Sequence, residues 1–283
     1  MISVIIPTYN RENTIKRSIE SVLIQGPIVT EIIVVDDGST DKTKQVLDTI
    51  NDNRIKYIKN DKSLGACASR NIGIKNSSNE IIAFQDSDDE WHNNKLETQI
   101  PYILEQNYDV VCSGYDQIKD GSRRYTGRKV DDNEIYSELL LDNFIGTPTI
   151  VGKKECFSST LFDTSIPRFQ DWDIMLRISK IYKVKFLNES LVNAYVQNDS
   201  ITRNMSSAII SLEIIMNKNK DQFTPELESI YYRKMGMYSI RSGDVKYNYF
   251  IQAYHCKKDL KTVVDFILAK FKLVKIIKIL HKS

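Results

Sequence analysis

Three carboxylates stand within four positions where the chain reads Asp86-Ser87-Asp88-Asp89. They directly follow an apolar run that predicts a buried strand, and no basic residue lies within the turn. Crowded negative charge is destabilising unless a cation neutralises it. Because carboxylate oxygens suit hard divalent cations, the segment predicts a Mg²⁺ or Mn²⁺ site that bridges to a diphosphate. The alternative is an Asp-rich surface turn or helix start.

A second acidic turn, Asp36-Asp37-Gly38-Ser39, follows another predicted buried strand. Asp-Gly is a turn signal and Ser39 can cap the next helix, which is a purely structural explanation. This explanation leaves one of the two carboxylates without a structural role. Asp37 is therefore a candidate acceptor for a hydrogen bond from the edge of a base, and Tyr9 can offer its aromatic face to a ring.

The segment from Gly65 to Gly73 places small residues and Arg70 at the start of a predicted helix. This arrangement admits a phosphate-bearing ligand close to the backbone, although small helix residues also serve tight packing. Neither the Walker phosphate loop nor the G-x-G-x-x-G fingerprint occurs in the sequence. That absence argues against ATPases and nicotinamide-dependent enzymes.

Gln170-Asp171-Trp172-Asp173 precedes an apolar helical pattern. Asp171 can act as a helix N-cap, with Asp173 supporting the helix dipole. The functional alternative is a general base, because a carboxylate fixed at a helix start can take a proton from a hydroxyl group. The choice depends on whether Asp171 faces the same edge as the other acidic turns.

The elements that must position these residues follow a βαβ pattern over the first 110 residues. Such a pattern predicts the α/β class, with a Rossmann-like, mainly parallel sheet flanked by helices. The predicted strands are residues 4–7, 31–36, 55–58, 81–86 and 109–113, and the predicted helices are residues 11–25, 41–50, 66–75 and 93–106. Ligands bind beyond the carboxyl ends of parallel strands, so the acidic turns should meet on one rim.

The second half of the chain is less regular. Residues 116–133 predict a long loop or a ragged hairpin, which suits a binding element. The later predicted elements are a helix at 174–182, strands at 184–187 and 191–196, and helices at 208–218, 225–240, 246–256 and 260–280. A boundary near Met205 divides the chain into a catalytic domain (1–205) and a helical C-terminal region (206–283).

The composition is that of a globular protein, with 41% hydrophobic and 27% charged residues and a net charge of +2. So even a balance argues against nucleic acid as a partner. Residues 257–283 are locally basic, with eight lysines against Asp259 and Asp265. This tail predicts either contact with an anionic membrane surface or a packed helix with a solvated lysine face.

The four cysteines are scattered and form no CxxC pair, which argues against a zinc site or a disulfide framework and favours reduced thiols. The first residues lack the pattern of a signal peptide, and no apolar run is long enough to span a membrane. We therefore expect a cytoplasmic location, with the inner face of the cell membrane as the place of any membrane contact.

Taken together, the motifs resemble those of the family 2 glycosyltransferases, inverting nucleotide-sugar enzymes of the GT-A fold. The resemblance covers about residues 1–200 and keeps the family's motif order. The similar segments are residues 4–10, 33–41, 65–73, 84–89 and 170–173. By this resemblance the chain moves a sugar from a nucleotide-sugar donor, with a UDP-sugar expected, to an acceptor hydroxyl.

The resemblance also implies roles for single residues. Asp37 would contact the uracil, with Pro7 and Tyr9 lining the base site, and Asp86 would lie at the ribose. Asp88 would hold Mn²⁺ or Mg²⁺. Asp171 would be the catalytic base for an in-line attack that inverts the anomeric carbon. The implied nucleotide-binding residues, with the phosphate candidate included, are Pro7, Tyr9, Asp37, Arg70 and Asp86.

The sequence departs from the family pattern at Tyr195 and Gln197, where many relatives carry an Arg and a His. That departure argues against a further metal or diphosphate ligand at these two positions. The resemblance implies a glycan or lipid-linked acceptor in the synthesis of a surface polysaccharide or glycolipid, and the basic tail suits the membrane face. The alternative is a non-catalytic nucleotide-binding or scaffold subunit. A metal-dependent nucleotidyltransferase, which would release pyrophosphate, is more distant.

Overall fold

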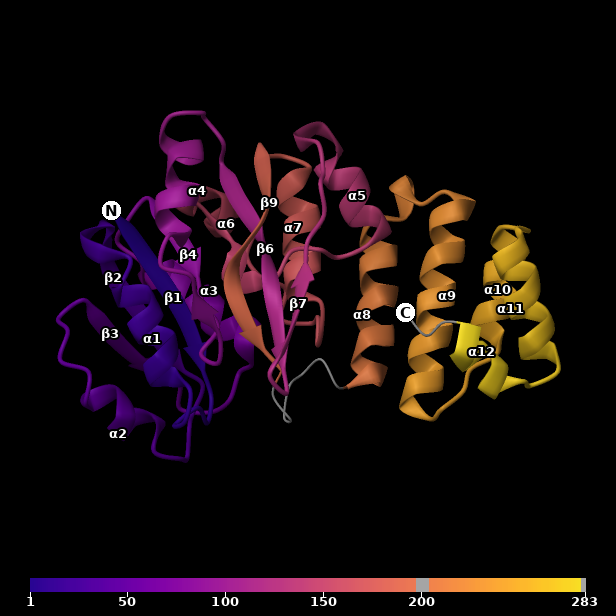
Figure 1. Cartoon of the computed structure of the whole chain (residues 1–283), viewed down its shortest axis with the longest axis horizontal. Coiled ribbons are helices and arrows are strands. Elements are labelled where there is room, and N and C mark those ends of the chain that lie inside the picture. The colour runs from indigo at the N-terminus through magenta and orange to yellow at the C-terminus, as the bar shows by residue number, and fades with distance from the viewer. Residues whose placement is uncertain (197–203, 281–283) are drawn as a thin grey trace. The chain divides into compact units, whose positions relative to one another are not determined.

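The computed structural model describes residues 1–196 and 204–280. Within this part the chain forms two compact units (Figure 1). The sheet unit comprises residues 1–164 and 170–196, and the helical unit comprises residues 165–169 and 204–280. No helix in these described ranges is long and apolar enough to cross a membrane. The sequence predicts a catalytic domain at 1–205 and a helical C-terminal region at 206–283, and the roles of these two domains stay a prediction.

The sheet has the strand order β3-β2-β1-β4-β8-β6-β9-β5, and β7 pairs with β6. The strands are β1 (Ile2–Thr8), β2 (Val29–Asp36), β3 (Ile55–Lys59), β4 (Ile81–Phe84), β5 (Glu90–Trp91), β6 (Val110–Lys119), β7 (Ser122–Thr126), β8 (Val151–Lys153) and β9 (Val184–Tyr195). The first four strands run parallel, as do β6 and β9, while β5, β7 and β8 are antiparallel to their partners. The predicted mixed α/β fold with a mainly parallel sheet is confirmed.

Helices accompany this sheet and build the helical unit. In the sheet unit they are α1 (Ile15–Leu23), α2 (Thr43–Asp48), α3 (Ala66–Asn76), α4 (Lys95–Leu104), α5 (Ile135–Leu141), α6 (Lys154–Ser159) and α7 (Gln170–Ser179). In the helical unit they are α8 (Met205–Lys218), α9 (Pro225–Ser242), α10 (Asn248–Cys256), α11 (Leu260–Lys270) and α12 (Val274–Leu280). Figure 1 shows the helical unit, in orange to yellow, as helices without strands.

The core explains why the first strands form where the apolar runs stand. Ile2, Val4 and Ile6 of β1 and Ile32 and Val34 of β2 are fully buried and belong to one apolar cluster. Alternate side chains of each strand also enter the core on the other face, because helices cover both sides of a parallel sheet. The carboxyl ends of β1, β2 and β4 therefore lie next to one another, as expected.

Several predicted elements differ from the observed ones. Residues 116–133 contain the β6–β7 hairpin, so the hairpin alternative is confirmed. The two predicted late strands are one continuous strand, β9, and the helix predicted at 174–182 begins earlier, at Gln170. The helix predicted over 260–280 is broken into α11 and α12, because Lys272 adopts a left-handed backbone conformation with φ of 56°.

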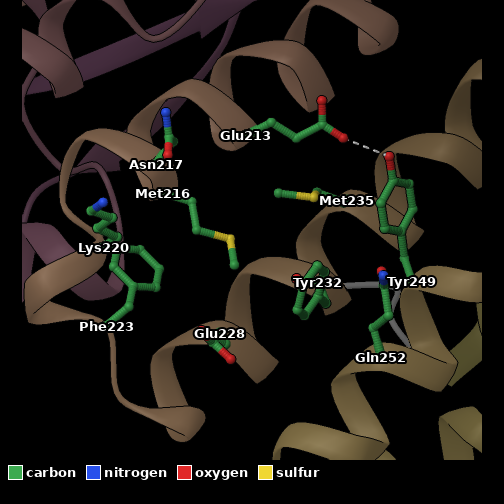
Figure 2. A pocket seen from close by; sticks show the side chains of 10 residues that line it. All are labelled: Glu213, Met216, Asn217, Lys220, Phe223, Glu228, Tyr232, Met235, Tyr249 and Gln252. Carbon is green, nitrogen blue, oxygen red and sulfur yellow. Dashed lines mark hydrogen bonds between the residues drawn. The ribbon is translucent and has the colours of Figure 1, made fainter.

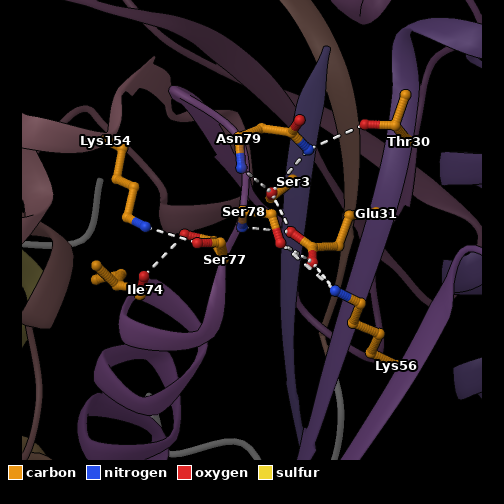
Figure 3. A network of polar contacts seen from close by, with 9 residues as sticks. All are labelled: Ser3, Thr30, Glu31, Lys56, Ile74, Ser77, Ser78, Asn79 and Lys154. Carbon is orange, nitrogen blue, oxygen red and sulfur yellow. Dashed lines mark hydrogen bonds and ion pairs between the residues drawn. The ribbon is translucent and has the colours of Figure 1, made fainter.

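A polar network holds the opposite edge of the sheet, at the amino ends of β1, β2 and β4 (Figure 3). The buried Glu31 carboxylate accepts hydrogen bonds from Ser3, Lys56 and the backbone and hydroxyl of Ser78. Burial alone would raise the pKa of Glu31, but these donors outweigh it and lower the pKa to about 2. The network fixes the sheet at the edge away from the candidate site.

Candidate active site

The loops after β1 and β2 are bound to each other by backbone-to-side-chain hydrogen bonds. The N–H of Asn10 donates to Ser39 Oγ at 2.9 Å, and the N–H of Thr40 donates to Asn10 Oδ1 at 2.9 Å. Further along, the N–H of Arg11 donates to Thr43 Oγ1 at 2.7 Å. Two strand ends thus share one polar rim. Tyr9, on the first loop, is 48% exposed, whereas Pro7 is buried within β1.

Asp37 organises the loop that leads into α3. Its carboxylate accepts hydrogen bonds at 2.7–3.2 Å from two backbone N–H groups and three side chains, contributed by Asn60, Ser63, Leu64, Gly65 and Ser69. Burial alone would raise the pKa of Asp37, but these donors hold it below its usual value. Gly65 presents its N–H at a φ of 89°, a conformation that favours glycine.

Asp37 therefore reaches the predicted rim, but five protein donors already occupy its two oxygens. A carboxylate offers about four lone-pair sites, so the shell is full. The uracil contact implied for Asp37 stays a prediction, and it requires one of these donors to give way to the base.

Arg70 connects the loop after β4, which contains Asp86, to the start of α7. Its Nη2 pairs with Asp86 Oδ1 at 2.7 Å, and its Nη1 donates to Gln170 Oε1 at 2.9 Å. The guanidinium is nearly buried, and Asp86 is half-buried. This geometry brings Arg70 and Asp86 together, as expected of a shared site, and also brings Asp171 to the same rim through its neighbour Gln170.

Asp171 is half-buried in the first turn of α7. Its Oδ1 accepts hydrogen bonds from Asn143 Nδ2 at 3.1 Å and from the N–H of Trp172 at 2.8 Å. The other oxygen, Oδ2, takes part in neither of these hydrogen bonds. Burial raises the pKa of Asp171 to about 6, with Asp86 adding to the rise and Arg70 opposing it.

The three acidic residues of the Asp86–Asp89 turn have different environments. Asp88 is half-buried, with its Oδ2 3.5 Å from Arg11 Nε. Asp89 is buried, and it accepts a hydrogen bond from the N–H of Tyr195 at 2.9 Å. Burial and the neighbouring carboxylates of Asp88 and Asp86 raise the pKa of Asp89 well above its usual value. Only Asp86 and Asp88 therefore retain partly accessible carboxylates.

A cation at this turn would be coordinated partly by the protein and partly by the substrate, because the turn does not form a complete set of protein ligands. No group of three or more His, Cys, Asp or Glu arranged to hold a metal occurs within residues 1–196 and 204–280. Mg²⁺ is usually held by only one or two carboxylates together with substrate phosphates. The oxygen donors of Asp88, with Asp86 nearby in the chain, meet that smaller requirement. The metal site stays a prediction.

Some residues of the site were not predicted from the sequence. Asn143 and Arg11 carry no motif signal, and their contacts arise only from the packing of α5 and of the first loop. Gln170 stands next to Asp171 in the sequence, which is the one signal that could have identified it. Tyr195 donates its hydroxyl to Glu90 at 2.8 Å, whereas Gln197 lies outside the described residues.

The helical unit holds a separate pocket of about 400 Å³ (Figure 2). Aromatic, methionine, amide and charged side chains line it, and Tyr249 donates its hydroxyl to Glu213 at 2.9 Å. None of the predicted site residues belongs to this pocket. The predicted site residues lie in the sheet unit.

Comparisons with known proteins identify the family and the fold. WfgD of Escherichia coli, named as a UDP-Glc:alpha-D-GlcNAc-diphosphoundecaprenol beta-1,3-glucosyltransferase, is 35% identical over 66% of this chain and 73% of its own length. An uncharacterized glycosyltransferase of Rickettsia conorii is 29% identical over 78% of this chain. The match covers only 42% of that relative's length.

Solved structures show the same fold. TarS residues 1–349 from S. aureus, in complex with UDP-GlcNAc, superposes with a TM-score of 0.63 at 18% identity, covering 95% of this chain and 79% of its own. The mannosyltransferase PcManGT from Pyrobaculum calidifontis, with GDP-Man and Mn²⁺, gives a TM-score of 0.62 at 14% identity, covering 100% and 87%. Residues 3–163, more than half of the chain, match the family described as glycosyl transferase family 2. The chain therefore belongs to glycosyl transferase family 2 and has the GT-A fold.

Proposed function

We propose that this glycosyltransferase transfers a sugar from a UDP-sugar to an acceptor hydroxyl with inversion at the anomeric carbon. The observation that carries the proposal is the meeting of Asp171 with the Arg70–Asp86 ion pair on one rim. A base and a nucleotide-side carboxylate must share one site for such a transfer. The UDP-containing names of WfgD and of the TarS complex support the choice of donor.

Asp171 is the general base of this proposal. Its Oδ1 is held by Asn143 and by the helix backbone, so its Oδ2 can face an acceptor hydroxyl. A pKa of about 6 leaves the carboxylate ionised at neutral pH and close to the value that favours proton transfer. The acceptor oxygen, deprotonated as it attacks, forms the new glycosidic bond while the bond from the anomeric carbon to the diphosphate breaks.

On the donor side, Asp37 contacts the uracil, and Pro7 and Tyr9 line the base site, where Tyr9 offers an exposed aromatic face. Asp86 lies at the ribose, and Arg70 balances its charge. Asp88 would hold Mn²⁺ or Mg²⁺ together with the diphosphate. When bound, such a cation stabilises the negative charge that develops on the leaving nucleoside diphosphate.

The acceptor proposed is a glycan or lipid-linked saccharide of a surface polysaccharide or glycolipid, as the name of WfgD suggests. We place the reaction in the cytoplasm. The non-catalytic alternative, a nucleotide-binding or scaffold subunit, predicts binding of a nucleotide without its release.

The test is a thermal-shift panel of UDP, GDP, CMP and ATP, each with and without Mn²⁺, followed by UDP-release assays. A ligand that binds only the folded state raises the melting temperature. A manganese-dependent shift with UDP, followed by UDP release that requires an acceptor, supports the proposal. Binding of UDP without release over a broad acceptor panel favours the scaffold subunit, and a shift with GDP alone would exclude the UDP-sugar.

A further inference from the structure

The last two helices carry one apolar face that packs inside the helical unit. Leu268 and Ala269 of α11 and Ile277 of α12 are buried, and they join a small core with Ile240 and Phe250. A helix that packs on one side normally exposes polar residues on the other. The predicted alternative of a packed helix therefore accounts for the buried side of the two helices.

A second apolar stripe lies on the exposed side of α11. Leu260, Ile267 and Phe271 are spaced seven and four residues apart, which aligns them along one side of the helix. Their exposed fractions are 81%, 45% and 68%. The helical spacing places them opposite Asp265 and Ala269, which are buried.

Further apolar residues are exposed beyond the bend at Lys272. Leu273 at the bend and Ile276 and Ile279 on α12 are exposed, Ile279 by 65%. We call the set from α11 and α12 the exposed apolar face; it comprises Leu260, Ile267, Phe271, Leu273, Ile276 and Ile279. Several large apolar side chains exposed close together along the chain mark a candidate binding surface.

Lysines dominate the exposed charge of the two helices, although Asp259 caps the start of α11. Lys261, Lys270, Lys272 and Lys275 are exposed on or between the two helices. The single acidic residue of the two helices, Asp265, is buried and paired with Arg233 at 2.7 Å. A second copy of the chain docked on this face would bring lysine against lysine, which opposes association.

We infer that the exposed apolar face binds an anionic lipid surface, with its apolar side chains inserted among the acyl chains and its lysines at the head groups. An apolar stripe flanked by lysines is the combination that favours interfacial binding, because burial of apolar area and attraction to anionic lipid then act together. This inference does not depend on the donor or on the reaction proposed above.

The test is cosedimentation of the full chain with vesicles of phosphatidylcholine alone or mixed with phosphatidylglycerol. We expect binding to the mixed vesicles that weakens as salt is added, because salt screens the attraction. The double variant Phe271→Ser with Ile279→Ser should bind at least about tenfold more weakly. Lys270→Gln and Lys275→Gln should each weaken binding about fivefold.

Matched controls lie in the sheet unit. Ile181 and Ile24 are exposed by 72% and 59%, and Lys62 is also exposed. The double variant Ile24→Ser with Ile181→Ser and the variant Lys62→Gln should sediment like the unchanged protein. Because all the substituted side chains are exposed, the melting temperatures should agree within a few degrees.

Three outcomes of the vesicle assay would overturn the inference. They are equal sedimentation of the Phe271→Ser, Ile279→Ser protein and the unchanged protein, equal binding to neutral and anionic vesicles, and no sedimentation with either. A loss of self-association by the same variant in analytical ultracentrifugation without vesicles would also overturn it, because the face would then bind a second copy. UDP binding, measured in parallel, should be the same in every variant.

Discussion

Arg70 forms an ion pair with Asp86, with 2.7 Å between Nη2 and Oδ1, although the two residues come from different elements of the sheet unit. The pair has a second role beyond its own charge balance. Its cation lowers the pKa of Asp171, while its carboxylate raises it. The two sides of the proposed reaction are thus coupled electrostatically before any ligand binds.

Replacing the proposed base should stop the transfer without affecting the donor. Asp171→Asn keeps the shape of the side chain but cannot accept the proton, so kcat should fall by about 10²–10⁴. The thermal shift with UDP and Mn²⁺ should remain. The control is Asp173→Asn in the same helical turn, which breaks a pair with Arg177 at 2.7 Å and should lower stability more than kcat. Normal turnover in Asp171→Asn would remove Asp171 from the mechanism.

The rate should depend on pH through Asp171. Since its pKa is about 6, kcat/KM should rise with pH through that value as the base loses its proton. The hydrogen bond from Asn143 lowers this pKa, so Asn143→Ala should shift the acidic limb to higher pH. Asn53→Ala, at an exposed position, is the matched control. If the pH profile of kcat/KM were the same in Asn143→Ala, a group other than Asp171 would determine the acidic limb of that profile.

The metal assignment predicts a specific loss. Asp88→Ala should remove the manganese dependence of UDP affinity, because one oxygen ligand of the cation is lost. Isothermal titration with and without Mn²⁺ measures this difference directly. Asp61→Ala, which removes an exposed carboxylate, should leave both titrations unchanged. Identical titrations for Asp88→Ala and the unchanged protein would place the cation elsewhere.

The lowered pKa of Glu31 predicts that its contribution to stability is lost only at acidic pH. Its pKa falls from 4.5 unfolded to about 2 folded, so its contribution is full above pH 4.5 and is lost as the pH falls through 2. That shift corresponds to about 3 kcal/mol. Urea unfolding of Glu31→Gln at pH 7 should show a loss of this order, and the difference from the unchanged protein should narrow below pH 4.5. If the difference in the free energy of unfolding did not change with pH, the shape of the Glu31 side chain and not its charge would account for the stabilisation.

Lys95 predicts the opposite kind of effect. It is fully buried, donates to Gln99 at 2.6 Å, and burial lowers its pKa to about 7. The unfolded chain binds the proton more tightly, so the cost to stability is full below pH 7 and disappears as the pH approaches 10.5. Lys95→Met removes this cost, together with the hydrogen bond and a contact of the ammonium with the Trp91 ring at 4.2 Å, and should raise the free energy of unfolding at pH 7. Its advantage in urea unfolding should shrink by pH 10, and a gain that does not change with pH would contradict this account.

The first four strands and the two acidic turns could be predicted from the sequence. Their signals are local, because an apolar run such as Ile81 to Phe84 followed by carboxylates marks both a strand and its end. The meeting of Asp171 with the rim could not be derived from periodicity. It depends on how α7 packs, and it entered the prediction only through the family resemblance.

Other misses have the same origin. Asn143 approaches Asp171 only because α5 packs beside α7, a tertiary contact with no sequence signal. The bend after α11 falls at Lys272, where neither Gly nor Pro marks a break. Burial of Ile277 on one side of the bend and Leu268 on the other fixes this conformation. Such choices depend on packing, which overrides local propensity.

The hydrogen bonds that join Asn10 to Ser39 and Thr40 have a consequence for the thermodynamics of ligand binding. The two rim loops hold each other in place without a nucleotide, so a ligand meets an ordered backbone. Binding then loses little conformational entropy at these loops. Calorimetry should accordingly find a small entropic penalty for UDP, and Asn10→Ala should enlarge it.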